Sequence, residues 1–268
     1  MVECLWAFGH VGFFLRAVAD DNRTYMNRIR LMLSAAFILV SGCELWRPPM
    51  ATPEELNKGL VVMYPGALNT TTEMVGVHEG LREAGIDYAI EVVQWGMPLA
   101  NFLIPTTFLA AQRPWATIEA NRIARYSAEH PGSPVTLLGF SGGAMMCILV
   151  AEAMPENTSV DWVIMLGPGV SPAYDLDPML KCTTRGAVVY WSPIDFLSSQ
   201  VTVALGTLDG VFGPSAATFG FTTRNEKLTQ IEWSSANLQN GNDGGHTGYI
   251  SSASWIRDFV APGIVNKQ

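Results

Sequence analysis

The chain has 268 residues, of which 49% are hydrophobic and 15% are charged, and its formal net charge is −8 at pH 7. This amount of apolar material is enough to build one sizeable core. An acidic chain without clusters of lysine and arginine argues against nucleic acid as the main partner. The spacing of its cysteines and histidines matches no common pattern of metal ligands.

Residues 1–43 have the composition of an export signal. Three arginines precede the short apolar run 31–40, and small residues follow it. This run is too short to span a bilayer, which takes about 20 residues. The stretch Val40-Ser41-Gly42-Cys43 resembles the lipobox of bacterial lipoproteins, which implies cleavage before Cys43, a lipid on its thiol and translation from Met26. The alternative is an ordinary buried N-terminal helix.

After a proline-containing linker at 44–58, short apolar runs alternate with helical patterns. Strands of five or six apolar residues between helices of about a dozen are typical of parallel strands joined by helical crossovers. We therefore expect an α/β fold, a three-layer α/β/α sandwich with a mostly parallel sheet of about six strands, over residues 59–268. The expected strands are 59–64, 88–95, 134–139, 162–166, 187–191 and 228–233, and the expected helices are 72–84, 117–129, 144–154 and 252–260.

Two long segments between these elements, 97–116 and 196–227, lack a clear period and contain aromatic residues. Loops longer than about 15 residues in a compact domain are usually functional. We expect both to be loops that lie where they can cover a site and set its specificity.

A Gly-x-Ser-x-Gly motif, Gly139-Phe140-Ser141-Gly142-Gly143, directly follows the expected strand 134–139 and opens the expected helix 144–154. A serine on such a sharp strand-to-helix turn exposes its Oγ at the carboxyl edge of the sheet. The amino end of the following helix favours negative charge that develops there. This context indicates a nucleophilic Ser141 more strongly than the five residues alone.

The motif, the element order and the partners that follow resemble the α/β-hydrolases over residues 59–262. In that family the nucleophile is followed by an acid and then by a histidine, and His246 is the only histidine after Ser141. The resemblance implies that His246, in the glycine-rich loop before the last helix, is the base. His78 and His130 precede Ser141, and we expect them to be surface or helix-cap residues.

The acid is less strongly specified by the sequence. Asp195 follows the expected strand 187–191, which is the usual acid position of the family. Asp175 and Asp177 follow the preceding strand, where some relatives keep the acid, and Asp209 lies in a glycine-flanked turn. We expect Asp195 to hold the second ring nitrogen of His246.

The resemblance also implies an oxyanion hole made of two backbone N–H groups. The residue after the nucleophile, Gly142, supplies one. The loop after the first strand supplies the other, and Ala67 is our candidate because Gly66 permits a turn before it.

Four cysteines occur in the chain, and two of them, Cys147 and Cys182, lie in the expected domain. In an oxidising compartment they could form a disulfide. The alternative, which we favour, is two separate buried thiols, because Cys147 occupies an apolar position of an expected helix.

The resemblance implies cleavage of a small carboxylic ester through a Ser-His-Asp triad and an acyl-enzyme, with no cofactor and no metal. An amidase or an acyltransferase would use the same residues, and an inactive surface-anchored binding module is a further alternative. The signal implies an exported protein that meets the membrane only through a lipid on Cys43.

The signal interpretation makes a testable prediction. When the gene is expressed in a bacterium that processes lipoproteins, the mature protein should begin at an acylated Cys43 and partition into detergent. Cys43→Ser should leave the precursor uncleaved and unlipidated. Mass spectrometry that finds an unmodified Cys43 inside an intact N-terminus would rule the signal out.

Overall fold

The structure is a computed structural model, and it describes residues 46–96 and 105–265. The chain divides into two units, Met1–Cys43 and Glu44–Gln268. The expected export signal and Cys43 lie outside the described residues. Among the residues that the structure does describe, no helix has the length and hydrophobicity needed to cross a membrane.

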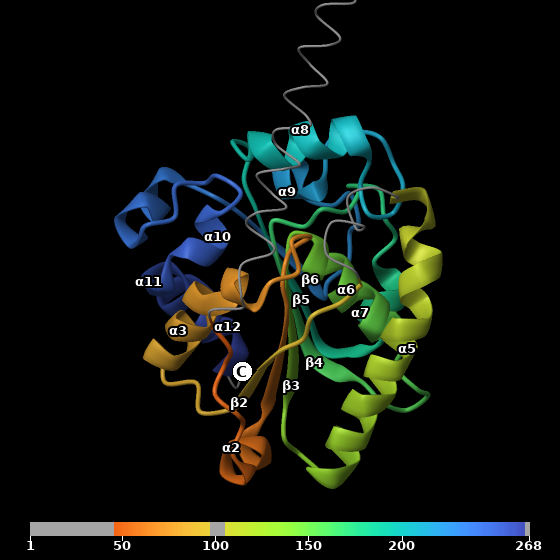
Figure 1. Ribbon diagram of the computed structural model, residues 1–268, viewed down its shortest axis with the longest axis vertical. Coiled ribbons are helices and arrows are strands. Elements are labelled where there is room, and N and C mark those ends of the chain that lie inside the picture. The colour runs from red at the N-terminus through yellow and green to blue at the C-terminus, as the bar shows by residue number, and fades with distance from the viewer. Residues whose placement is uncertain (1–45, 97–104, 266–268) are drawn as a thin grey trace, which may run out of the picture. The chain divides into compact units, whose positions relative to one another are not determined.

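Six parallel strands form one sheet in the order β2-β1-β3-β4-β5-β6 (Figure 1). Because β1 pairs with both β2 and β3, the strand order reverses at β1, and ligands of open α/β sheets bind at the carboxyl ends of strands beside such a point. The strands are β1 Leu60–Tyr64, β2 Ala89–Val92, β3 Val135–Phe140, β4 Val160–Leu166, β5 Thr183–Trp191 and β6 Leu228–Glu232.

Helices cover both faces of the sheet, as the alternation of side chains along a strand requires. On β1, Leu60, Val62 and Tyr64 enter one core cluster, and Val61 and Met63 enter the other. The predicted α/β fold, a three-layer sandwich on a parallel sheet, is therefore confirmed. Helices α5 Pro105–Glu129, α6 Gly142–Glu152 and α7 Asp177–Lys181 lie on the first face, and α3 Val75–Glu83, α10 Gly248–Ser251, α11 Ala253–Trp255 and α12 Ala261–Val265 lie on the second (Figure 1).

Three segments expected to lack regular structure contain helices, and the first two are 44–58 and 97–116. The linker 44–58 includes α2 Pro53–Lys58, which begins with a capping box. In that box the Glu55 N–H donates to Thr52 Oγ1 over 3.2 Å and the Thr52 N–H donates to Glu55 Oε2 over 2.8 Å. Helix α5 begins at Pro105, twelve positions before the expected start at 117, and it continues through an internal Pro114.

The segment 196–227 contains α8 Phe196–Leu205 and α9 Ala216–Phe219, so the expectation of a loop there was wrong. Helix α8 shows no apolar stripe in its sequence because apolar residues occur on both its inner and its exposed side. Phe196 and Val203 are more than half exposed, at 63% and 56%. The sequence did contain the residue that ends α8. Gly206 follows the last helical residue and has φ 90°, a conformation that favours glycine.

Close contact between the start of α6 and the end of β1 fixes the turn that carries Ser141. A Cβ atom added to Gly143 would lie 2.0 Å from the Tyr64 carbonyl oxygen, a backbone atom that no rotamer change can move aside. Glycine is therefore required at 143 for packing.

Gly143→Ala should destabilise the domain by about 3 kcal/mol, because overpacking against backbone is not relieved by a rotamer change. For a domain of this size we expect the melting temperature to fall by about 6–12 °C. Gly213→Ala is the control, since an added Cβ there meets no atom within 4 Å. Equal melting temperatures for the two variants would contradict this account of the turn.

Candidate active site

Ser141 sits between the last residue of β3 and the first residue of α6 in a strained backbone conformation. Its φ is 52° and its ψ is −111°, a region that residues with a side chain rarely adopt. The Ser141 N–H donates to the Leu166 carbonyl over 2.9 Å, and the Gly169 N–H donates to the Ser141 carbonyl over 3.1 Å. Neighbouring strand ends thus hold the strained turn in place.

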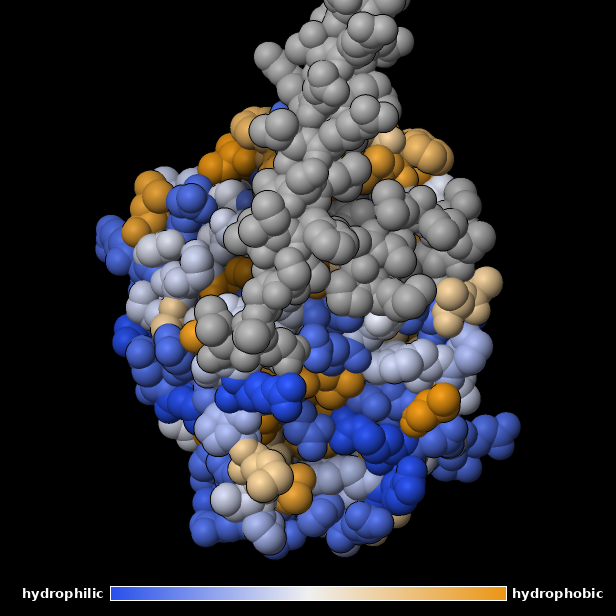
Figure 2. Space-filling view, viewed as in Figure 1, coloured by the Kyte–Doolittle hydropathy of each residue, from blue (hydrophilic) through white to orange (hydrophobic). Residues whose placement is uncertain are grey.

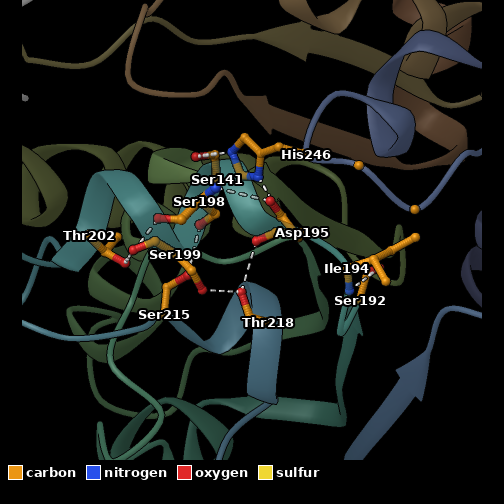
Figure 3. A network of polar contacts seen from close by, with 12 residues as sticks. Ser141, Ser192, Ile194, Asp195, Ser198, Ser199, Thr202, Ser215, Thr218 and His246 are labelled. Atoms are coloured by element: carbon orange, nitrogen blue, oxygen red, sulfur yellow. Dashed lines mark hydrogen bonds and ion pairs between the residues drawn. The ribbon is translucent and has the colours of Figure 1, made fainter. Parts of the chain in front are cut away.

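His246 lies between Ser141 and Asp195 and contacts both (Figure 3). Its Nε2 is 2.9 Å from Ser141 Oγ, and its Nδ1 is 2.7 Å from Asp195 Oδ2. The three side chains come from loops after β3, β5 and β6, which meet at the carboxyl edge of the sheet. The His246 side chain is 13% exposed and that of Asp195 is 0% exposed, so the row runs from the cavity into the interior.

The Asp195 carboxylate has a second role as the N-cap of α8. Its Oδ1 accepts the Ser198 N–H over 3.0 Å, and its own carbonyl accepts the Thr218 hydroxyl over 3.1 Å (Figure 3). The amino end of a helix stabilises negative charge. Both oxygens of this fully buried carboxylate are therefore hydrogen-bonded, one to His246 and the other at the amino end of α8.

The other aspartates considered from the sequence have partners elsewhere. Asp209 Oδ1 accepts the Ser171 N–H over 2.8 Å, and its Oδ2 accepts the Ser171 hydroxyl. Asp175 Oδ1 accepts the N–H of Asp177 over 3.0 Å, and Asp177 accepts the side-chain amide of Asn225 over 2.9 Å. These contacts account for the three carboxylates without His246.

The two histidines before Ser141 lie away from this row. His130 follows α5, and its Nδ1 is 2.9 Å from Asn57 Oδ1. His78 on α3 is buried beside the Trp46 ring, so its expected surface position was wrong. Its burial arises because α3 presents this side to the N-terminal segment rather than to solvent, and burial lowers the pKa of His78.

Gly142 and Ala67, the two expected oxyanion donors, line one cavity together with Ser141 and His246. Gly142 is the first residue of α6, and the first N–H groups of a helix have no partner within it. Ala67 occupies a turn closed by the Asn69 N–H, which donates to the Gly66 carbonyl over 3.0 Å.

The loop that carries Ala67 is fixed by two residues that the sequence analysis missed, Asn69 and Trp95. The Trp95 N–H donates to Asn69 Oδ1 over 2.8 Å, and the Asn69 amide donates in return to the Trp95 carbonyl. The Trp95 indole N–H donates to the Pro65 carbonyl over 2.8 Å. Asn69 has φ 58°, which asparagine tolerates better than most residues. The one indication of this role in the sequence is that Trp95 ends the expected strand 88–95.

Glu73 is a further residue of the cavity wall that the sequence analysis did not single out. It belongs to the short 3-10 helix η1, Thr71–Met74, and its Oε2 accepts the Thr70 N–H over 3.1 Å. Burial raises the pKa of Glu73 to about 7, although the Thr70 N–H and the charge of His246 both act to lower it.

The cavity has a volume of about 380 Å³ and its wall is mostly apolar. Helix α8 forms one side of it, and Figure 2 shows apolar residues gathered at the end of the molecule that α8 occupies in Figure 1. The apolar residues of the wall are Ala67, Leu68, Phe140, Leu197, Val201, Leu205, Leu208 and Ile250.

Cys147 is buried in α6 and Cys182 is partly buried, and both are free thiols. The sequence left open either a disulfide or two separate thiols, and in the structure the two thiols are separate. Burial raises the pKa of both, which disfavours the thiolate form. The residues that the structure describes contain no cluster of three or more side chains able to hold a metal ion.

No protein-family model matches the chain, and no curated protein matches it. Among solved structures, a Thermoplasma acidophilum protein described as a predicted CIB-like hydrolase is 15% identical with a TM-score of 0.43, and the match covers 77% of this chain and 86% of that one. The esterase domain of a Rhodothermus marinus protein is 14% identical with a TM-score of 0.43, covering 77% and 84%. Aspergillus fumigatus lipase B is 14% identical with a TM-score of 0.48, covering 78% and 54%. The chain itself has a parallel six-stranded sheet in the order β2-β1-β3-β4-β5-β6 with helices on both faces, which is the α/β sandwich expected from the sequence.

Proposed function

We propose that the protein is a serine hydrolase that cleaves carboxylic esters through Ser141, His246 and Asp195. The observation that carries the proposal is the continuous hydrogen-bonded row from Asp195 Oδ2 through the imidazole to Ser141 Oγ, with distances of 2.7 and 2.9 Å. Both lie within the reach that proton transfer needs. The row opens into a cavity beside two candidate oxyanion donors.

In the proposed reaction, Ser141 Oγ forms a bond to the ester carbonyl carbon as its proton moves to His246 Nε2. The same proton then leaves with the alcohol when the ester C–O bond breaks, and an acyl-enzyme remains. Water attacks this intermediate by the same route and releases the acid. Asp195 accepts the Nδ1–H throughout, which keeps Nε2 free to act as base.

The negative oxygen of each tetrahedral intermediate would accept the N–H groups of Gly142 and Ala67. Donors of this kind contribute about 3–4 kcal/mol to the transition state because they are already oriented before reaction. The hydrogen bonds between Asn69 and Trp95 supply that orientation for the Ala67 loop. The α6 turn supplies it for Gly142.

The cavity wall indicates the class of ester. Apolar side chains of α8 and of the loop 206–208 face the site, and Glu73 is its charged exception. Transfer of apolar surface out of water favours an uncharged acyl chain there, at about 25 cal/mol per Å² buried. We propose that the substrates are small-molecule esters with an apolar acyl group.

We also propose, from the sequence of residues 1–43, that the protein is exported and contacts the membrane only through a lipid on Cys43.

Asp195→Asn tests the proposed row without removing a group that fills space. We expect the variant to fold and to hydrolyse a p-nitrophenyl ester about 10⁴-fold more slowly, because an amide favours the wrong imidazole tautomer. Ser141→Ala should be inactive, and Asp209→Asn is the matched control with near wild-type turnover. A variant at Asp195 that keeps most of its activity would refute the proposed acid.

Two substitutions on α8, each replacing a valine with tryptophan, test whether this helix selects the acyl chain. Val201 lines the cavity, whereas Val203 on the same helix is 56% exposed and absent from its wall. Val201→Trp should lower kcat/KM for an octanoate ester relative to an acetate ester by at least about tenfold, since the space for the chain is filled. Val203→Trp should leave that ratio unchanged. Equal ratios in both variants would show that the acyl chain lies elsewhere.

A further inference from the structure

Glu73 lies in the wall of the cavity that contains Ser141 and His246, yet the proposed reaction assigns it no role. A Cβ atom added to Gly66 would lie 2.7 Å from Glu73 Oε1 and 3.0 Å from the Phe140 ring. The carboxyl group is therefore packed against the backbone of the turn that carries Ala67. The Phe140 ring in turn lies 4.9 Å from the His246 ring, centroid to centroid.

Glu73 and Trp95 hold the Ala67 turn from two sides. Trp95 binds it through Asn69 and Pro65 at the carboxyl end of β2. Glu73 binds the following segment from η1, where its Oε2 accepts the Thr70 N–H over 3.1 Å. An ionised carboxylate accepts such a bond more strongly than a neutral acid does. The state of Glu73 therefore affects how firmly the Ala67 N–H is oriented.

The charged group that acts on Glu73 across the cavity is His246 when it is protonated. In the proposed reaction His246 becomes an imidazolium as it takes the Ser141 proton, and a nearby negative charge stabilises that form. Asp195 supplies one such charge from the interior side. Glu73 supplies a second charge from the cavity side.

We propose that Glu73 is a positioning residue of this site: its ionised carboxylate holds the Ala67 turn in place and stabilises the imidazolium of His246 during reaction. The proposal rests on the proposed ester hydrolysis. The burial that raises the pKa of Glu73 to about 7 makes this contribution dependent on pH in the neutral range. At lower pH the carboxyl group is protonated and the contribution is lost.

The test compares wild type with Glu73→Gln, using kcat and KM for a p-nitrophenyl ester from pH 5.5 to 9. At pH 8.5 we expect kcat of the variant to be about tenfold lower with KM little changed, since the lost interaction acts mainly in the transition state. The ratio of wild-type to variant kcat should shrink toward one at pH 5.5, where Glu73 is protonated. Glu79→Gln, at an exposed position of α3, is the control and should match wild type throughout.

A purely structural role would give a ratio that does not change with pH, and either that result or an unchanged kcat would overturn the proposal. If Glu73→Gln does not fold, Glu73→Asp replaces it. That variant keeps an ionisable group at a shorter reach, so the rise of its kcat near pH 7 should move, and an unmoved profile would count against the proposal. If Ser141→Ala is inactive while Glu73→Gln has the kcat of wild type at every pH, the hydrolase function stands and only the role of Glu73 is refuted.

Stability supplies a second readout that does not depend on turnover. Because the pKa of Glu73 is raised above the usual 4.5, its favourable contribution to folding is complete below about pH 4.5 and is lost as pH rises through 7. Glu73→Gln removes this loss. Urea denaturation should therefore show the free energy of unfolding of the variant increasing relative to wild type between pH 5 and pH 8.5. A difference that stays constant with pH would contradict titration of Glu73 in this range.

Discussion

The site depends on the close approach of the first turn of α6 to the end of β1. Gly143 meets the Tyr64 carbonyl with no room for a Cβ atom, and Ser141 before it is held at φ 52°. This contact places the Ser141 hydroxyl at the carboxyl edge of the sheet and aligns the amino end of α6 behind it. The backbone strain at Ser141 is offset by a helix that is buried along nearly its whole length between the sheet and α5.

A second constraint links the interior of the domain to its cavity through Asp195. One carboxylate oxygen starts α8 and the other binds His246, so the helix that forms one wall of the cavity and the row beneath it share an anchor. On the opposite side, the Ala67 turn is held by Asn69 with Trp95 and by Glu73. The site therefore lies between two hydrogen-bonded supports, an arrangement that orients donors and base before a substrate arrives.

The central strands were predictable because they are apolar runs, and β1 and β3 are buried along their whole length, whereas the edge strand β6 is only partly buried. The serine turn was predictable because its glycines fall between a strand and a helix. The structure also brings together the serine, histidine and aspartate that the sequence singled out. Helix α8 was missed because it is apolar on its exposed side as well as on its inner side, which removes the period that identifies a surface helix. Asn69 and Trp95 were missed because their partners are backbone groups distant along the chain. Glu73 forms a capping box with Thr70, a Thr-x-x-Glu pattern that the sequence does contain, but its place in the cavity wall depends on the fold.

Labelling with a fluorophosphonate tests the central claim, that Ser141 is a nucleophile activated by His246 and Asp195, most directly. The reagent bonds covalently to an activated serine and needs no knowledge of the natural substrate. Mass spectrometry of the wild-type protein should find one adduct, on the peptide that contains Ser141. His246→Ala and Asp195→Asn should slow its formation by orders of magnitude, and Ser141→Ala should abolish it. A folded wild-type protein that gives no adduct, or an adduct at another residue, would contradict the account.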